Sequence, residues 1–133
     1  MGDEVIKQKI LVVDDDEDIR YIVARTLEKM GYEVLGVESS LKAIRTVAKQ
    51  RFSLAIVDIK MADMGGPEAI VEMRKYDPQM PVILMTGSPD WPDRELRVTC
   101  QGCLYKPFRL EQLRSLVQTV LGGPSQKKPE RLP

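Results

Sequence analysis

The sequence predicts an α/β fold, a single domain in which helices cover both faces of one parallel β-sheet. Five short runs are continuously apolar, as expected for strands buried on both faces, and they occupy residues 9–13, 33–37, 54–58, 81–86 and 103–105. The segments between these runs repeat apolar residues at helical spacing. Strands that alternate with helices imply right-handed crossovers and a doubly wound sheet. A length of 133 residues suits one such domain.

The first helix is expected to follow the first strand and to end at Gly31, a residue suited to close a helix. Three acids, Asp16, Glu17 and Asp18, fall in its first turn, where the positive end of the helix dipole favours negative charge. Its apolar face comprises Ile19, Ile22, Val23, Thr26, Leu27 and Met30.

Four further helices are predicted with different degrees of regularity. The second has a face that comprises Leu41, Ile44, Val47 and Ala48, and the third has one that comprises Pro67, Ile70, Val71 and Arg74. The fourth connection contains Pro89 and Pro92, so a helix there would be short and would begin at about Asp93. The last helix stops at Gly122, and its face comprises Leu110, Leu113, Leu116, Val117, Val120 and Leu121.

Two terminal segments are expected to lie outside the domain. Residues 1–8 form an N-terminal extension. Residues 122–133 are rich in glycine, proline and charge, which is typical of a disordered tail or a linker. The domain is therefore predicted to span residues 9–121.

Composition excludes several classes of function. Lys plus Arg and Asp plus Glu both number 20, so no net positive charge attracts nucleic acid. Histidine is absent, which removes histidine-based triads, histidine-ligated zinc and a phosphohistidine formed on this chain. No apolar run approaches the roughly 20 residues of a membrane span, and the N-terminus lacks a signal peptide, so a cytoplasmic protein without membrane association is expected. Cys100 and Cys103 cannot fill a tetrahedral zinc site alone and are predicted to be structural thiols.

Polar residues end the strands at the edge of the sheet where ligands bind in open parallel folds. Asp14 and Asp15 follow the first strand, Asp58 ends the third, Thr86 the fourth, and Lys106 follows the fifth. Carboxylates that converge raise one another's pKa, and a hard divalent cation such as Mg²⁺ relieves this repulsion. A metal, a lysine and a hydroxyl together suit phosphoryl transfer, for which a carboxylate is the available nucleophile.

Four segments, taken together and in this order, resemble the receiver domain of two-component response regulators: ILVVDDDEDIR, LAIVDIKMADMGG, VILMTGS and LYKPF. The resemblance extends from about Lys9 to Leu121. It implies a flavodoxin-like (βα)5 fold with the strand order 2-1-3-4-5. It also implies a signalling protein that catalyses only its own phosphorylation and dephosphorylation, and not a metabolic enzyme.

The resemblance assigns roles to the acidic residues. Asp58 corresponds to the phosphoacceptor, which takes a phosphoryl group from the phosphohistidine of a sensor histidine kinase or a histidine phosphotransfer protein. The resulting change in protein contacts acts on a downstream target that the sequence does not identify. Mg²⁺, with Mn²⁺ as an alternative cation, is implied at Asp14, Asp15, Asp58 and the backbone carbonyl of Lys60.

The resemblance also assigns roles at the ends of the last two strands. Thr86 and Lys106 correspond to the hydroxyl and the ammonium group that contact the phosphoryl group. The peptide bond between Lys106 and Pro107 is expected to be cis, which is mostly a proline option.

Three departures from the family pattern affect what can be expected of the switch. Ala62 replaces the usual proline of the loop after Asp58, which predicts a more mobile loop. Cys103 occupies the switch position that is normally aromatic, and a thiol is too small to move as a ring does. The stretch between Thr86 and Lys106 is about two residues shorter than usual, which predicts a remodelled face around the fourth helix.

Parts of the sequence are also compatible with two other functions. A degenerate receiver would act as a binding module independent of phosphorylation, supported by Cys103 and Ala62. A phosphatase of the haloacid-dehalogenase type would use Asp14 and Asp16 as a D-x-D pair, but it usually has another acidic pair after the lysine. Asp63 is predicted to be a solvated loop acid and not a metal ligand.

Overall fold

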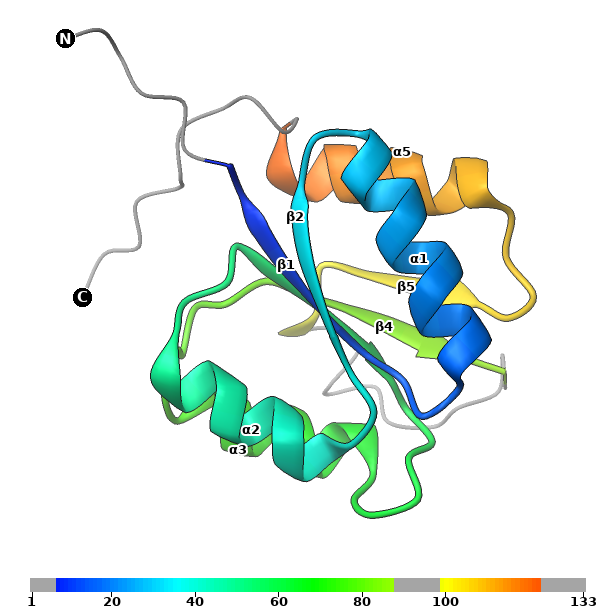
Figure 1. Ribbon diagram of the computed structural model, residues 1–133. Coiled ribbons are helices and arrows are strands. Elements are labelled where there is room, and N and C mark those ends of the chain that lie inside the picture. Colours follow the sequence, from blue (N-terminus) through cyan, green and yellow to red (C-terminus); the bar gives the residue numbers. More distant parts are fainter. Residues whose placement is uncertain (1–6, 88–98, 123–133) are drawn as a thin grey trace, which may run out of the picture.

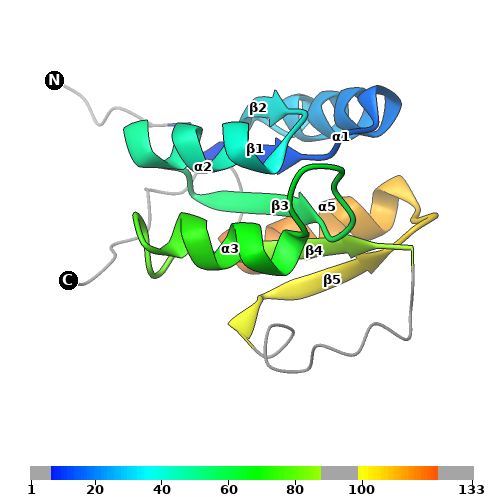
Figure 2. The same ribbon diagram turned by 90° about the horizontal axis from the view of Figure 1, so that it is seen from below.

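The computed structural model describes residues 7–87 and 99–122, which form one five-stranded parallel sheet with helices on both sides (Figure 1). Its elements in chain order are β1 (Lys9–Val13), α1 (Glu17–Lys29), β2 (Glu33–Val37), α2 (Ser40–Lys49), β3 (Leu54–Asp58), α3 (Gly66–Arg74), β4 (Val82–Thr86), β5 (Gly102–Tyr105) and α5 (Leu110–Leu121). The strand order is β2-β1-β3-β4-β5, as Figure 2 shows. The predicted fold class and strand order are therefore confirmed.

The three central strands divide the core into two clusters. Successive residues of a strand point to opposite faces, so Leu11 and Val13 join one cluster while Ile10 and Val12 join the other. The first cluster also contains residues of α2 and α3, and the second contains residues of α1 and α5. Figure 1 shows these helix pairs on opposite sides of the sheet. β3 and β4 are buried along their whole length, as continuous apolar runs predict.

The prediction that all five strands are buried on both faces is wrong for the edge strands. In β2 only Val37 is buried, and Leu35 is 38% exposed. In β5 only Leu104 is buried. β2 and β5 each pair with one neighbour and therefore lie where the helices cover the sheet least.

The helix faces also differ in part from the sequence pattern. Leu41 and Val71 are 48% and 57% exposed, and Ala48 is exposed as well. Ala43 and Ala69 are fully buried instead. α2 and α3 pack against each other as well as against the sheet, so small side chains fill the narrow space between them. The faces of α1 and α5 agree better, although Ile22 is 41% exposed.

Several expectations concern the limits of the domain. Gly31 follows α1 with a positive φ of 102°, as a closing residue should. Gln8 is buried, and its carbonyl accepts the backbone N–H of Glu33 at 3.0 Å, so this residue of the expected N-terminal extension packs against the sheet. The expected fourth helix from about Asp93, like residues 1–6 and 123–133, lies outside the described residues.

Cys100 and Cys103 are half-buried thiols that form no disulfide bond with each other, and they pack against the cluster beneath α2 and α3. Burial raises the pKa of the Cys100 thiol, which keeps it protonated. Within the described ranges, no helix combines the length and apolar character needed to cross a membrane.

The loop between β3 and α3 closes tightly on Gly66. Its backbone N–H donates to the carbonyl of Ile59 at 2.8 Å, so the end of the loop returns to its start. A Cβ at Gly66 would lie 2.7 Å from the Cα of Ile59 and 2.9 Å from the carbonyl oxygen of Asp58. These neighbours are backbone atoms that cannot rotate away, so only glycine fits this position.

We therefore expect Gly66→Ala to lower the free energy of unfolding by about 1–3 kcal/mol, because a side chain there forces the backbone apart. The matched control is Gly65→Ala, where the nearest atom to the added Cβ is Pro67 Cδ at 3.7 Å, an ordinary contact. This control is expected to change stability by less than about 1 kcal/mol. Urea unfolding monitored by circular dichroism measures both variants, and equal losses would contradict the steric argument.

Candidate functional site

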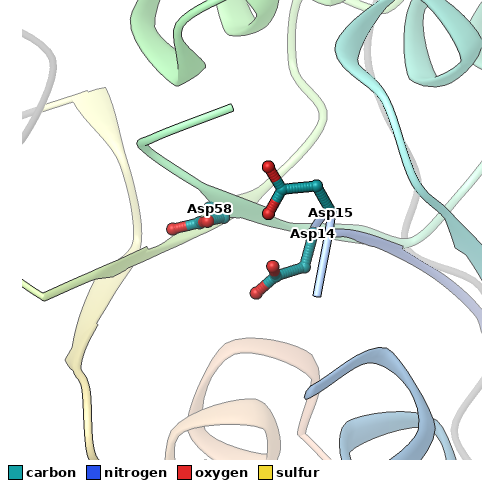
Figure 3. Close-up of side chains that lie close together, drawn as sticks. All are labelled: Asp14, Asp15 and Asp58. Atoms are coloured by element: carbon teal, nitrogen blue, oxygen red, sulfur yellow. The ribbon is translucent and has the colours of Figure 1, made fainter. Parts of the chain in front are cut away.

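Three carboxylates meet at the carboxyl ends of β1 and β3 (Figure 3). Asp14 and Asp15 come directly after β1, and Asp58 is the last residue of β3, which pairs with β1. One oxygen from each side chain lies within 4.8 Å of the others. Asp14 is fully buried and Asp58 is 6% exposed, whereas Asp15 is exposed. The structure therefore brings the three predicted acids together.

Backbone and side-chain hydrogen bonds fix Asp14 in place. Its N–H donates to the carbonyl of Val37 at 3.2 Å, and its own carbonyl accepts Arg20 Nη1 at 2.8 Å. Asp14 Oδ1 accepts the backbone N–H of Asp16 at 2.9 Å. The second oxygen, Oδ2, accepts a hydrogen bond from the ammonium group of Lys106. Asp14 is thus a rigid part of the site.

Lys106 bridges the two buried carboxylates. Its Nζ lies 2.8 Å from Asp14 Oδ2 and 3.5 Å from Asp58 Oδ2. Its backbone N–H donates to the carbonyl of Thr86 at 2.7 Å, which ties the residue after β5 to the end of β4. The Lys106–Pro107 peptide bond is cis, as expected. One ammonium group therefore compensates part of the negative charge of the site.

The electrostatics follow from this crowding. Burial raises the pKa of Asp58 to about 6, and the charge of Asp14 adds to the rise, while Lys106 and the backbone N–H of Lys60 act against it. Burial alone would lower the pKa of Lys106, but its hydrogen bond to Asp14 and the charge of Asp58 outweigh burial and raise that pKa. The site therefore holds more negative charge than one lysine can compensate.

Thr86 and Cys103 lie on the neighbouring strands. Thr86 ends β4 one residue after Met85, the register partner of Asp58, and it is buried. Cys103 pairs with Leu84, and Tyr105 is the register partner of Thr86. The structure thus places Thr86 beside the acids and Cys103 farther back along β5.

Asp63 has a structural role that the sequence did not indicate. It is exposed, as predicted, but its Oδ1 and Oδ2 accept the backbone N–H groups of Ser40 and Leu41 at 3.1 and 3.0 Å. These two bonds lower the pKa of Asp63, that of Leu41 contributing most. Ser40 Oγ also donates to the carbonyl of Met64 at 2.8 Å. The loop after Asp58 is therefore anchored to α2 by hydrogen bonds, and the greater mobility expected from Ala62 stays a prediction.

The acids that follow Asp14 and Asp15 in the sequence stabilise the start of α1. Asp16 is the N-cap, and its Oδ1 accepts the N–H groups of Asp18 and Ile19 at 2.9 and 3.3 Å. Glu17 and Asp18 lie in the first turn. The carboxylate of Asp16 caps α1 and is not one of the three that converge at the site. Asp16 is therefore not positioned to act as the acid/base of a D-x-D phosphatase.

The donor set fits a hard divalent cation. Three carboxylates supply oxygen ligands only, two of them are buried, and burial together with the charge of Asp14 raises the pKa of Asp58. Mg²⁺ binds few carboxylates and retains water, which the exposed position of Asp15 allows. Asp14, Asp15 and Asp58 are the side chains that could hold such an ion.

A model of the response regulator receiver domain family matches residues 10–118. Sporulation initiation phosphotransferase F of Bacillus subtilis is 30% identical over 119 residues, which cover 88% of this chain and 96% of that protein. Several other curated relatives are longer, and the chain spans about a quarter to a half of their length.

Two solved structures are similar in fold and sequence. Chemotaxis response regulator CheY4 of Vibrio cholerae has 34% identity and a TM-score of 0.78, with 87% of this chain and 100% of that chain covered. Response regulator protein TrrA of Thermotoga maritima, in complex with Mg²⁺-BeF, has 28% identity and a TM-score of 0.78, with 86% and 99% covered. The arrangement of the site and these matches lead to one conclusion: the chain belongs to the response regulator receiver domain family of two-component signalling proteins.

Proposed function

We propose that the chain is a Mg²⁺-dependent phosphoaspartate switch in which Asp58 accepts a phosphoryl group from a phosphohistidine. The observation that carries this proposal is the geometry of Asp58, a buried carboxylate that lies beside two other acids and within 3.5 Å of the Lys106 ammonium group. The donor is a sensor histidine kinase or a histidine phosphotransfer protein, because the chain has no histidine of its own.

The transfer uses Asp58 as the nucleophile. A carboxylate oxygen of Asp58 attacks the phosphorus, the bond between phosphorus and the imidazole nitrogen breaks, and the imidazole leaves with the electron pair. Lys106 moves from the carboxylates to the phosphoryl oxygens and compensates their charge, and the Thr86 hydroxyl donates to one of them. Attack by water on the resulting acyl phosphate releases inorganic phosphate and resets the switch. Such a protein catalyses only reactions of its own side chain.

Asp14, Asp15, Asp58 and the backbone carbonyl of Lys60 would hold the metal. When bound, Mg²⁺ supplies positive charge that stabilises the transferring phosphoryl oxygens. The related TrrA is described in complex with Mg²⁺-BeF, which supports magnesium as the cation. Manganese, which the sequence also allowed, has no support of its own.

The partner has a surface on which to dock beside Asp58. A groove of about 420 Å³ adjoins the site and is lined by Ile19, Ile22, Lys106, Pro107, Phe108 and Leu110. Its mainly apolar lining suits a protein partner that brings a phosphohistidine to Asp58.

A net charge of zero does not favour nucleic acid as the partner of this domain. We also propose that the protein is located in the cytoplasm and that its receiver domain spans residues 9–121.

A phosphorylation-independent binding module is the second candidate. Cys103 at the switch position supports it, because a thiol cannot repeat the motion of an aromatic ring. The complete set of Asp58, Thr86 and Lys106 at the ends of adjacent strands favours the phosphorylated switch. The switch position holds Cys103 and not an aromatic residue. If Asp58 is phosphorylated, we therefore expect the change to reach a downstream protein by a route that does not use an aromatic ring at this position.

Phosphorylation distinguishes the two candidates. Incubation with acetyl phosphate and Mg²⁺ is expected to add one phosphoryl group to the protein and none to Asp58→Asn, as measured by intact mass. Asp15→Ala should slow the reaction at least about tenfold, because a metal ligand is lost. Asp18→Ala, in the same run of acids but in the first turn of α1, is the matched control and should react normally. Absence of an adduct on the unmodified protein with any phosphodonor would favour the binding module.

The burial of Asp58 beside the charge of Asp14 predicts how stability depends on pH. The pKa of Asp58 is about 6 in the folded protein and 3.8 in an ordinary carboxyl group, so ionisation of Asp58 disfavours folding. The stability gained by binding this proton is complete below about pH 4 and is lost as the pH rises through about 6. Without Mg²⁺, we expect Asp58→Asn to raise the free energy of unfolding by about 1–3 kcal/mol at about pH 7.5.

This gain should shrink towards zero at about pH 4.5, where the native carboxyl group is protonated. Mg²⁺ should raise the midpoint of thermal unfolding of the unmodified protein more than that of Asp58→Asn, because it binds the folded state and relieves the repulsion. Asp18→Asn serves as a charge-matched control. A variant Asp58→Asn no more stable than the unmodified protein at the higher pH would show that the ionised Asp58 is not destabilised by its burial beside Asp14.

A further inference from the structure

We propose that Asp63 is a positioning residue for the metal site. It anchors the β3–α3 loop to the N-terminus of α2 and so holds the part of the loop that contributes to the site. This inference rests on the proposed function, since it concerns the same site. Asp63 itself is not among the acids that converge there, which are Asp14, Asp15 and Asp58. Both of its carboxylate oxygens already accept backbone N–H groups of α2. It therefore acts through the loop and not as a ligand.

The two ends of this loop are fixed to the sheet independently of Asp63. The N–H of Ile59 donates to the carbonyl of Met85 at 2.9 Å, which holds the start of the loop against β4. The N–H of Gly66 donates to the carbonyl of Ile59 at 2.8 Å, which closes the loop. Neither bond fixes the residues in the middle of the loop.

The middle of the loop is held by α2. Asp63 accepts from Ser40 and Leu41, and the carbonyl of Met64 accepts from Ser40 Oγ. Ser40 is fully buried, so this end of α2 is a rigid support. The loop has Ala62 and not a proline, so its backbone is not stiffened by a ring at that position. The hydrogen bonds from α2 supply the restraint instead.

The position of Lys60 depends on this restraint. Lys60 lies between the fixed start of the loop and the anchor at Asp63, and its side chain is exposed. Its backbone N–H lies close enough to the carboxylate of Asp58 to lower the pKa of that group. Because Lys60 lies between the fixed Ile59 and the segment held at Asp63, release of that segment should let the backbone of Lys60 move relative to Asp58. Groups that orient the ligands of a metal site commonly change metal affinity about tenfold or more when removed.

The chain offers a matched control for the loss of the anchor. Ser39 is the N-cap of α2, and its Oγ accepts the N–H of Lys42 at 3.1 Å without contacting the loop. Ser39→Ala and Asp63→Ala both remove acceptors from the N-terminus of α2 and should both lower the midpoint of thermal unfolding. Only Asp63→Ala also releases the loop. A change confined to Asp63→Ala is therefore not a consequence of a less stable helix.

The experiment is a titration of each variant with Mg²⁺, followed by amide NMR shifts, which report binding and folding together. We expect Asp63→Ala to bind Mg²⁺ about tenfold more weakly than the unmodified protein and Ser39→Ala to bind it equally well. Asp63→Asn removes the same charge but keeps one acceptor oxygen, so its affinity should lie between the two. The loss should persist at about 0.5 M NaCl, where long-range attraction between Asp63 and the cation is screened.

The outcomes separate this inference from the proposed function. If the unmodified protein binds Mg²⁺ and Asp63→Ala binds it with the same affinity, the positioning role is wrong while the proposed function stands. If Asp63→Ala and Asp63→Asn lose affinity equally and the loss disappears in high salt, Asp63 acts only through its charge and the inference is again wrong. If the unmodified protein does not bind Mg²⁺, both proposals fail.

Discussion

Two buried carboxylates, Asp14 and Asp58, face the same ammonium group at the ends of adjacent parallel strands, and their repulsion is the constraint on which the rest of the structure depends. A sheet that only needed to fold would place neutral side chains there. The surrounding elements instead hold the charges together: Arg20 and Asp16 fix Asp14, and the link between Lys106 and Thr86 fixes the lysine. The carboxylates are therefore already held in positions where they could bind an additional cation.

The sequence predicted the central part of the fold well because its signals are local. β3 and β4 are continuous apolar runs bounded by polar residues, and the strand order follows from their alternation with helices and from the family resemblance. The acids of the site were predicted for the same reason, since they end these runs. The edge strand β2 has a similarly apolar run, and its exposure depends on its place in the sheet, which no local pattern reports.

The contacts that the sequence could not predict join segments that are distant along the chain. Asp63 pairs with residues 22 and 23 positions away, and nothing in its surroundings distinguishes it from a solvated acid. The burial of Ala43 in place of Leu41 likewise depends on how closely α2 approaches α3. The hydrogen bonds that join the loop containing Ala62 to α2 are likewise absent from any local pattern, because they depend on how the loop meets another element.

The ion pair between Lys106 and Asp14 joins residues 92 positions apart. During synthesis from the N-terminus, Asp14 and Asp58 leave the ribosome well before Lys106, so a nascent chain carries the acids without their lysine. The repulsion then opposes premature closure of β1 against β3, and the ammonium group arrives only with the final strand. Domains of this size generally fold as units, and this late charge would favour folding after the whole sheet is available.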